Sequence, residues 1–305
     1  MSENNNLEFG QVVTAVVTPF DQDLAIDFQA YANVLEHLID TGSSAVVVSG
    51  TTGESPTLRS SEKFELLKFT LKQVKGRIKV VFGAGTNDTK KSIELSKQAC
   101  SIGADGLLVV APYYNKPNQS GLIAHFSAIA NSVNLPIIIY NIPGRSGITI
   151  ENQTILELNK TCSNIQYLKD STGNLNKANE LDLNKNEGLK VYSGDDEFTL
   201  AFLRLGASGV ISVASHLIGR QINNLINAYF NQDLNSAKAI HKKCLPLFKN
   251  LFIEPNPVCV KFALAQIGLI KPYVRLPLTQ LAPESKKIIT ETMMQFTELK
   301  SLNKC

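Results

Sequence analysis

The sequence predicts an α/β fold, a (β/α)8 TIM barrel followed by a small C-terminal helical domain. Eight short runs of aliphatic and β-branched residues recur along the chain, bounded by Gly, Pro or polar residues. The runs are apolar throughout, which is typical of parallel strands covered on both faces. Their starts lie between 19 residues (190 to 209) and 34 residues (45 to 79) apart, and a helical pattern follows each run. Repeated βα units of this size indicate a barrel.

The eight runs give the expected strands Val12–Thr18, Ala45–Ser49, Lys79–Phe82, Gly106–Val110, Pro136–Tyr140, Gln166–Lys169, Lys190–Tyr192 and Gly209–Val213. A doubly wound sheet is the main rival, but no GxGxxG segment follows any of these runs. The runs therefore favour a closed barrel.

Between the strands, apolar residues recur on one helical face, as Phe28, Tyr31 and Leu35 do. The expected helices are Asp27–Thr41, Ser60–Lys75, Asp88–Ile102, Ser120–Val133, Glu151–Lys160, Asn174–Asn184, Asp195–Leu205 and Ile218–Asn231. Asp88, Ser120 and Asp195 are the expected N-terminal caps.

The strand pattern stops after Asn231, and only helical patterns follow. They cover Leu234–Asn250, Val258–Ile267 and Glu284–Lys300, and the EPNP segment (254–257) separates the first from the second. We expect a catalytic barrel in residues 1–231 and a helical domain in residues 232–305.

Composition excludes several classes of protein. The chain has 305 residues, 44% of them hydrophobic, and 30 Lys and Arg against 27 Asp and Glu. A scattered net charge of +3 does not predict binding to nucleic acid or to a membrane surface. The five cysteines show no CxxC spacing, which argues against a disulfide scaffold or a zinc site. The polar N-terminus has no signal-peptide pattern, and no apolar run reaches the ~18 residues of a membrane helix. We expect a cytoplasmic protein.

Lys169 is the first candidate catalytic residue, because barrel enzymes place their chemistry at the carboxyl ends of the strands. Tyr167 and Lys169 are two residues apart and share one strand face, so both point into the barrel while Leu168 points outward. A buried lysine is costly to keep charged, and a neutral amine can attack a carbonyl carbon. The alternative is a salt bridge with Asp170.

Other side chains at the strand ends suit acid–base chemistry and carboxylate binding. The Tyr140 phenol can move protons if it bonds to another hydroxyl, and Thr51 and Tyr114 are candidate partners. The Gly50–Gly53 turn, which includes Thr52, can offer backbone N–H groups to a carboxylate or phosphate. Arg145, in a Pro-Gly-Arg turn, suits bidentate carboxylate binding. Each also has an ordinary structural alternative: a core tyrosine, a plain turn and a solvated loop arginine.

The remaining candidates are weaker. His216 follows the eighth strand and is a candidate for lining the site, whereas His37, His125 and His241 read as structural or surface residues. Asp195 and Asp196 are expected to cap a helix, and no His, Asp or Glu set has metal-ligand spacing. We therefore expect no metal site.

The ordered motifs GTTGE, PYYN, YNIPGRSG, LKDSTGN, SGDD, GVISV and EPNP resemble those of the 4-hydroxy-tetrahydrodipicolinate synthases, formerly called dihydrodipicolinate synthases. The resemblance runs from Val12 to about Lys261 and is specific for the pyruvate-dependent class I aldolase superfamily, which includes N-acetylneuraminate lyases. It implies a homotetramer that condenses pyruvate with L-aspartate 4-semialdehyde in lysine and diaminopimelate biosynthesis.

The resemblance also implies roles for single residues. Lys169 would form a Schiff base with pyruvate, and Tyr140, Thr51 and a Tyr114 donated by a neighbouring subunit would relay protons. Thr52 would bind the pyruvate carboxylate with Thr51, and Arg145 would bind the carboxylate of the semialdehyde. The backbone carbonyls of Gly194 and Ile211 would complete the pocket. No cofactor or metal is implied.

Two alternatives stay open. A related aldolase that cleaves a 2-keto-3-deoxy sugar acid or sialic acid would share Lys169 and Tyr140, but relatives of that kind generally lack an arginine in the Arg145 loop. A non-catalytic keto-acid sensor would not need an imine-forming lysine.

The sequence departs from the family pattern at two places. His216 stands where relatives often carry Asn. Lysine-inhibited members use Tyr113 with a His and a Glu at positions that match Lys63 and Lys91 here. Two ammonium groups would repel an ammonium ligand, so we expect weak or absent inhibition by lysine.

Overall fold

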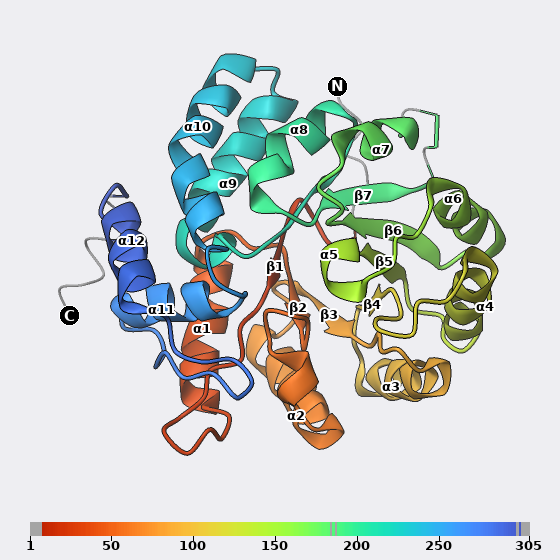
Figure 1. Ribbon diagram of the computed structural model, residues 1–305, viewed down its shortest axis with the longest axis horizontal. Helices are drawn as coiled ribbons and strands as arrows, with labels where there is room; N and C mark the ends of the chain where they lie inside the picture. Colours follow the sequence, from red (N-terminus) through yellow and green to blue (C-terminus); the bar gives the residue numbers. More distant parts are fainter. Residues whose placement is uncertain (1–7, 184, 187, 297–298, 300–305) are drawn as a thin grey trace.

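In the computed structural model, residues 8–183, 185–186, 188–296 and 299 are described. In this part of the chain, eight parallel strands close into one barrel in chain order, with β1 hydrogen-bonded to β8 (Figure 1). The strands are β1 (Val12–Ala15), β2 (Ala45–Val48), β3 (Lys79–Gly83), β4 (Gly106–Val110), β5 (Ile137–Asn141), β6 (Ile165–Asp170), β7 (Lys190–Ser193) and β8 (Gly209–Ser212). The predicted (β/α)8 barrel is confirmed.

Helices surround the barrel, and three short helical turns stand at its strand ends (Figure 1). The outer helices are α1 (Phe28–Asp40), α2 (Ser60–Val74), α3 (Thr89–Ile102), α4 (Gln119–Ala130), α6 (Asn152–Thr161), α7 (Leu175–Glu180), α8 (Thr199–Arg204) and α9 (Ser215–Phe230). The short turns are η1 (Ser55–Thr57), α5 (Pro143–Ser146) and η2 (Asp196–Phe198).

Strand residues alternate between two hydrophobic cores. One core fills the barrel interior and contains Phe9, Tyr167 and Tyr192, whereas Leu168 belongs to the core between strands and helices. The Phe9 ring lies 4.9 Å from the Tyr167 ring. Since Tyr167 points inward and Leu168 outward, Lys169 points inward, as predicted.

Several predicted element boundaries need correction. The N-cap of α4 is Asn118, whose side chain accepts from the Gly121 N–H, and not Ser120, whereas Asp88 does cap α3. The predicted turn at Arg145 is the short helix α5. The helix expected over Asn174–Asn184 ends at Glu180, and residue 184 lies outside the described residues. Residues 1–7, which carry most of the polar N-terminus, lie outside them too.

The C-terminal part is helical, with α10 (Leu234–Asn250), α11 (Val258–Gln266) and α12 (Pro283–Met293) lying on the α1 and α9 side of the barrel (Figure 1). Of the predicted helix Glu284–Lys300, residues 297–298 and 300 lie outside the described residues. A buried ion pair joins this part to the barrel, because Lys261 Nζ lies 2.5 Å from Glu54 Oε1. Arg275 adds to it by donating its backbone N–H to Glu54 Oε2 at 3.0 Å.

Candidate active site

Lys169 and Tyr140 stand side by side at the carboxyl ends of neighbouring strands. They are paired in the register of β5 and β6, and Lys169 Nζ lies 4.2 Å from the centroid of the Tyr140 ring. Both side chains are buried, with 6% of Lys169 and 5% of Tyr140 exposed. The barrel thus holds a primary amine against a phenol away from bulk water.

No ion pair between Lys169 and Asp170 occurs among the described residues. The Asp170 carboxylate instead accepts the Thr172 N–H at 2.8 Å. At the next strand end, burial raises the pKa of Asp195 to about 6, and the influence of Lys169 opposes that rise. The alternative of a salt bridge within LKD is therefore wrong.

Gly194 gives Lys169 its space. A β-carbon at position 194 would lie 3.1 Å from Lys169 Cε and would collide with Ser171 Oγ. A side chain at this position would therefore clash first with Ser171 and the Asp170 carbonyl and would also crowd the Lys169 side chain. Ile211, the other residue expected to offer a carbonyl, is fully buried in the barrel interior.

The Gly50–Gly53 turn is a tight loop with free donors. Left-handed residues flank it, Ser49 with φ of +58° and Glu54 with φ of +55°. Within the described residues, the backbone N–H groups of Thr51 and Thr52 have no acceptor, whereas that of Gly53 bonds to the Gly50 carbonyl at 3.1 Å. Adjacent unpaired N–H groups suit an anionic oxygen.

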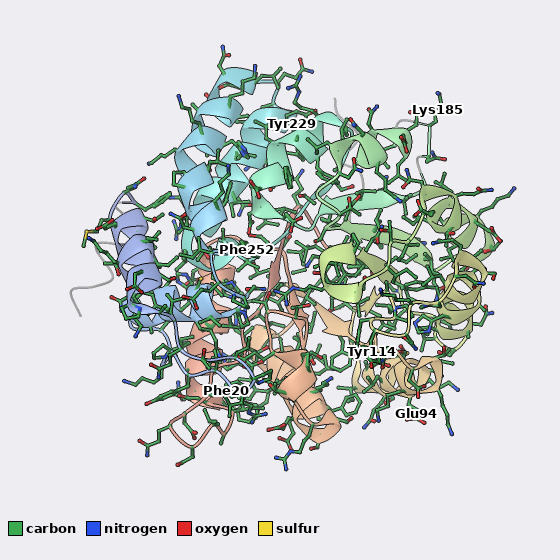
Figure 2. All side chains as sticks on the ribbon, in the orientation of Figure 1. Phe20, Glu94, Tyr114, Lys185, Tyr229 and Phe252 are labelled. Carbon is green, nitrogen blue, oxygen red and sulfur yellow. The ribbon has the colours of Figure 1, made fainter. Side chains whose placement is uncertain are left out.

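Tyr140, Thr51 and Arg145 line one cavity of about 280 Å³ at the barrel mouth. Tyr113 lines it too, but the predicted relay member Tyr114 does not. Tyr114 is 88% exposed with φ of +74°, and Figure 2 shows it beside α3, away from the barrel axis. Within one subunit the cavity lining includes one phenol, Thr51 and the arginine but not Lys169, Thr52 or Tyr114. Lys169 adjoins this lining through the Tyr140 ring, whereas Tyr114 lies apart.

His216 is corrected from a candidate site residue to a structural one. It is fully buried, its Nδ1–H donates to the Val213 carbonyl at 2.8 Å, and its Nε2 accepts the Val17 N–H at 3.2 Å. Burial lowers its pKa to about 4, so the ring is neutral. It joins the turn after β8 to the segment after β1 and does not line the cavity.

Sequence reasoning missed two residues that support the site. Asp196 does not cap a helix with its side chain; its buried carboxylate accepts from Ser212 Oγ and from the Val213 and Ala214 N–H groups at 3.0 and 2.9 Å. Asn256 donates through Nδ2 to Thr52 Oγ1 at 2.9 Å. The EPNP motif was visible in the sequence, where it predicted a break between helices and contributed to the family resemblance, but it did not single out Asn256.

Lys63 lines the cavity together with Arg145, so the lining contains two basic side chains. Burial and the neighbouring Lys91 lower its pKa, and none of the ion pairs among the described residues includes Lys63. Lys91 itself pairs with Glu94 at 3.7 Å and is not part of the cavity lining, so only Lys63 of the two expected lysines lines the cavity.

Among the described residues, no group of three or more His, Cys, Asp or Glu side chains is arranged to hold a metal ion. None of the helices in that part of the chain is long and apolar enough to cross a membrane.

A closed (β/α)8 barrel with a buried lysine and a cavity at the carboxyl ends of its strands defines the class of protein as a TIM-barrel enzyme. The chain belongs to the Dihydrodipicolinate synthetase family, whose sequence profile matches residues 8–296. It is 45% identical to 4-hydroxy-tetrahydrodipicolinate synthase 1 of Halalkalibacterium halodurans over 92% of this chain and 95% of the relative. It is 42% identical to the Bacillus subtilis 4-hydroxy-tetrahydrodipicolinate synthase over 95% of this chain and all of the relative.

Solved structures agree with this family. A dihydrodipicolinate synthase from Bacillus anthracis superposes with a TM-score of 0.92 at 41% identity, covering 95% of this chain and 99% of the other. One from Cyanidioschyzon merolae, solved with lysine bound, superposes with a TM-score of 0.91 at 41% identity over 94% and 98% of the two chains.

Proposed function

We propose that this chain condenses pyruvate with L-aspartate 4-semialdehyde to give 4-hydroxy-tetrahydrodipicolinate, the first committed step of lysine and diaminopimelate biosynthesis. The observation that carries the proposal is the buried Lys169 amine against Tyr140, beside a cavity that also holds Thr51 and Arg145. The sequence relatives carry the name of this enzyme, and the similarity extends over nearly their whole length.

The reaction begins when the Lys169 amine attacks the keto carbon of pyruvate and water leaves. The imine nitrogen that results withdraws electrons from the adjacent methyl carbon, which then loses a proton and becomes an enamine. Tyr140 is the proposed carrier of that proton, with Thr51 and the Tyr114 of a neighbouring subunit as its partners. The 88% exposure of Tyr114 supports such donation, because an exposed aromatic side chain is available to a partner.

The enamine carbon then attacks the aldehyde carbon of the second substrate, and the new oxygen takes up a proton. The amino group of that substrate next attacks the imine carbon, closes the ring and releases the Lys169 amine. One water is released in forming the imine, so the net reaction joins the two substrates with loss of one water.

Binding groups match the two substrates. Thr51 and Thr52, with their unpaired N–H groups, are the proposed site of the pyruvate carboxylate. Arg145 is the proposed partner of the semialdehyde carboxylate, since a guanidinium binds a carboxylate in a bidentate manner. The Gly194 and Ile211 carbonyls would bound the pocket. We further propose a cytoplasmic homotetramer, with the chemistry in residues 1–231 and helices in 232–305.

A coupled assay tests the proposal. Purified protein should consume pyruvate only when L-aspartate 4-semialdehyde is present, and should not cleave sialic acid or a 2-keto-3-deoxy sugar acid. Cleavage of either acid with no condensation would favour the related aldolase, and no turnover with any substrate would favour a sensor.

A further inference from the structure

Asn256 reaches from the C-terminal part of the chain into the proposed keto-acid site. Its side chain is buried, with 7% exposed, and Nδ2 donates to Thr52 Oγ1 at 2.9 Å across 204 residues of sequence. Its backbone carbonyl accepts from the Arg145 guanidinium at 3.5 Å. One residue outside the barrel strands thus contacts both groups that we propose to bind carboxylates.

The segment that carries Asn256 is fixed to the same loop. Lys261, on the first turn of α11, pairs with Glu54 at 2.5 Å, and Glu54 directly follows the Gly50–Gly53 turn. The Lys261 nitrogen also lies 4.2 Å from the Phe20 ring centroid. These buried contacts hold the distance between Asn256 and Thr52.

The hydrogen bond from Asn256 decides where the Thr52 proton points. An amide nitrogen donates and does not accept, so Thr52 Oγ1 receives a proton from Nδ2 and must donate its own elsewhere. The unpaired N–H groups of Thr51 and Thr52 add two more donors to the loop. Three donors in one loop match a carboxylate, which only accepts.

A buried amide side chain with a purely structural role would have hydrogen-bond partners for both its nitrogen and its oxygen. Asn256 Oδ1 is buried and has no hydrogen-bond partner among the described residues. Leaving a buried acceptor unpaired destabilises the fold, so stability alone does not explain this side chain.

We infer that Asn256 is a positioning residue of the keto-acid site, which holds the Thr52 hydroxyl as a donor toward the carboxylate of pyruvate. This inference rests on the proposed function. It assigns the EPNP segment to substrate binding as well as to the helix break.

The test compares the pyruvate KM with kcat in two variants. Asn256→Asp keeps the side-chain volume, but its carboxylate accepts the Thr52 hydroxyl proton. The hydroxyl then no longer donates toward pyruvate, and the new negative charge repels the pyruvate carboxylate. We expect its pyruvate KM to rise about ten-fold or more, with kcat at saturation within about three-fold of wild type. Asn256→Ala should raise KM less. Asn250→Ala, which removes an equivalent bond to Thr292 Oγ1 of 2.7 Å between α10 and α12, should leave KM unchanged.

A double-mutant cycle shows whether Asn256 acts through Thr52. In a Thr52→Val background, Asn256→Ala should raise the pyruvate KM no further, because the hydroxyl is already gone. Additive effects, or an Asn256→Asp KM within two-fold of wild type, would overturn the inference. Borohydride trapping distinguishes failure of the proposed function from failure of this inference. If wild-type enzyme is not labelled at Lys169, the proposed function is refuted. If wild type is labelled and Asn256→Asp has an unchanged pyruvate KM, only this inference is refuted.

Discussion

Lys169 Nζ lies 4.2 Å from the centroid of the Tyr140 ring, and the two residues are paired across β5 and β6. The strand register therefore fixes their approach independently of any loop. The amine proposed to capture the keto acid therefore lies beside the phenol proposed to carry a proton.

Tyr140→Phe should separate these two tasks. The ring stays against Lys169 while the hydroxyl is lost, and positioned proton transfer contributes about 10²–10⁴-fold to rates. We expect kcat to fall by about 100-fold or more while borohydride still traps pyruvate on Lys169. Tyr31→Phe is the matched control, since its buried hydroxyl bonds to Thr70 between α1 and α2. Unchanged kcat in Tyr140→Phe would remove the phenol from the mechanism.

Arg145→Ala should affect the second substrate more than the first. The guanidinium is proposed to bind the semialdehyde carboxylate, and hydrogen bonds to charged groups contribute about 1.5–3 kcal/mol, or roughly ten-fold or more in KM. Imine formation with pyruvate should change little. Arg220→Ala, which removes a bond to the Asp40 carbonyl on α1, serves as the control. Equal losses for both substrates would refute the assignment.

L-lysine should inhibit weakly or not at all. Lys63 lines the cavity and Lys91 lies close enough to lower its pKa, so an ammonium ligand would meet positive charge there, although Glu94 pairs with Lys91 at 3.7 Å. Activity titrated with L-lysine should show no half-inhibition below about 1 mM, which corresponds to about −4 kcal/mol of binding. Lys91→Glu should increase sensitivity, whereas Lys90→Glu beside it should have less effect. Potent inhibition of the wild type would contradict the electrostatic argument.

The barrel could be predicted from the sequence because eight βα units repeat along the chain. The inward direction of Lys169 could be predicted because side chains alternate between the two faces of a strand. Asn256 was not predictable, since its partner Thr52 lies 204 residues away and no local pattern encodes that bond. The error at His216 has a local cause. The helix α9 begins at Ser215 and departs from helical geometry at Ile218, with φ of −129°, so its first turn carries His216 toward Val17.

His216 should make stability depend on pH. Its folded pKa of about 4 lies below its usual 6.5, so the unfolded chain binds the proton more readily. The neutral ring therefore contributes fully to the free energy of unfolding above pH 6.5. This contribution falls as the pH drops toward 4, and the total loss is about 3 kcal/mol. His216→Asn should show a smaller fall in Tm between pH 7.5 and 5 than wild type. An identical fall would mean that the neutral ring does not contribute.

The most direct measurement is borohydride reduction in the presence of pyruvate, followed by peptide mass mapping. We predict that the reduced three-carbon adduct lies on the peptide containing Lys169, and that it disappears in Lys169→Arg, which keeps a long side chain but has no primary amine. An adduct on another lysine, or none on the wild-type protein, would contradict the central claim that the buried amine of Lys169 captures the keto acid.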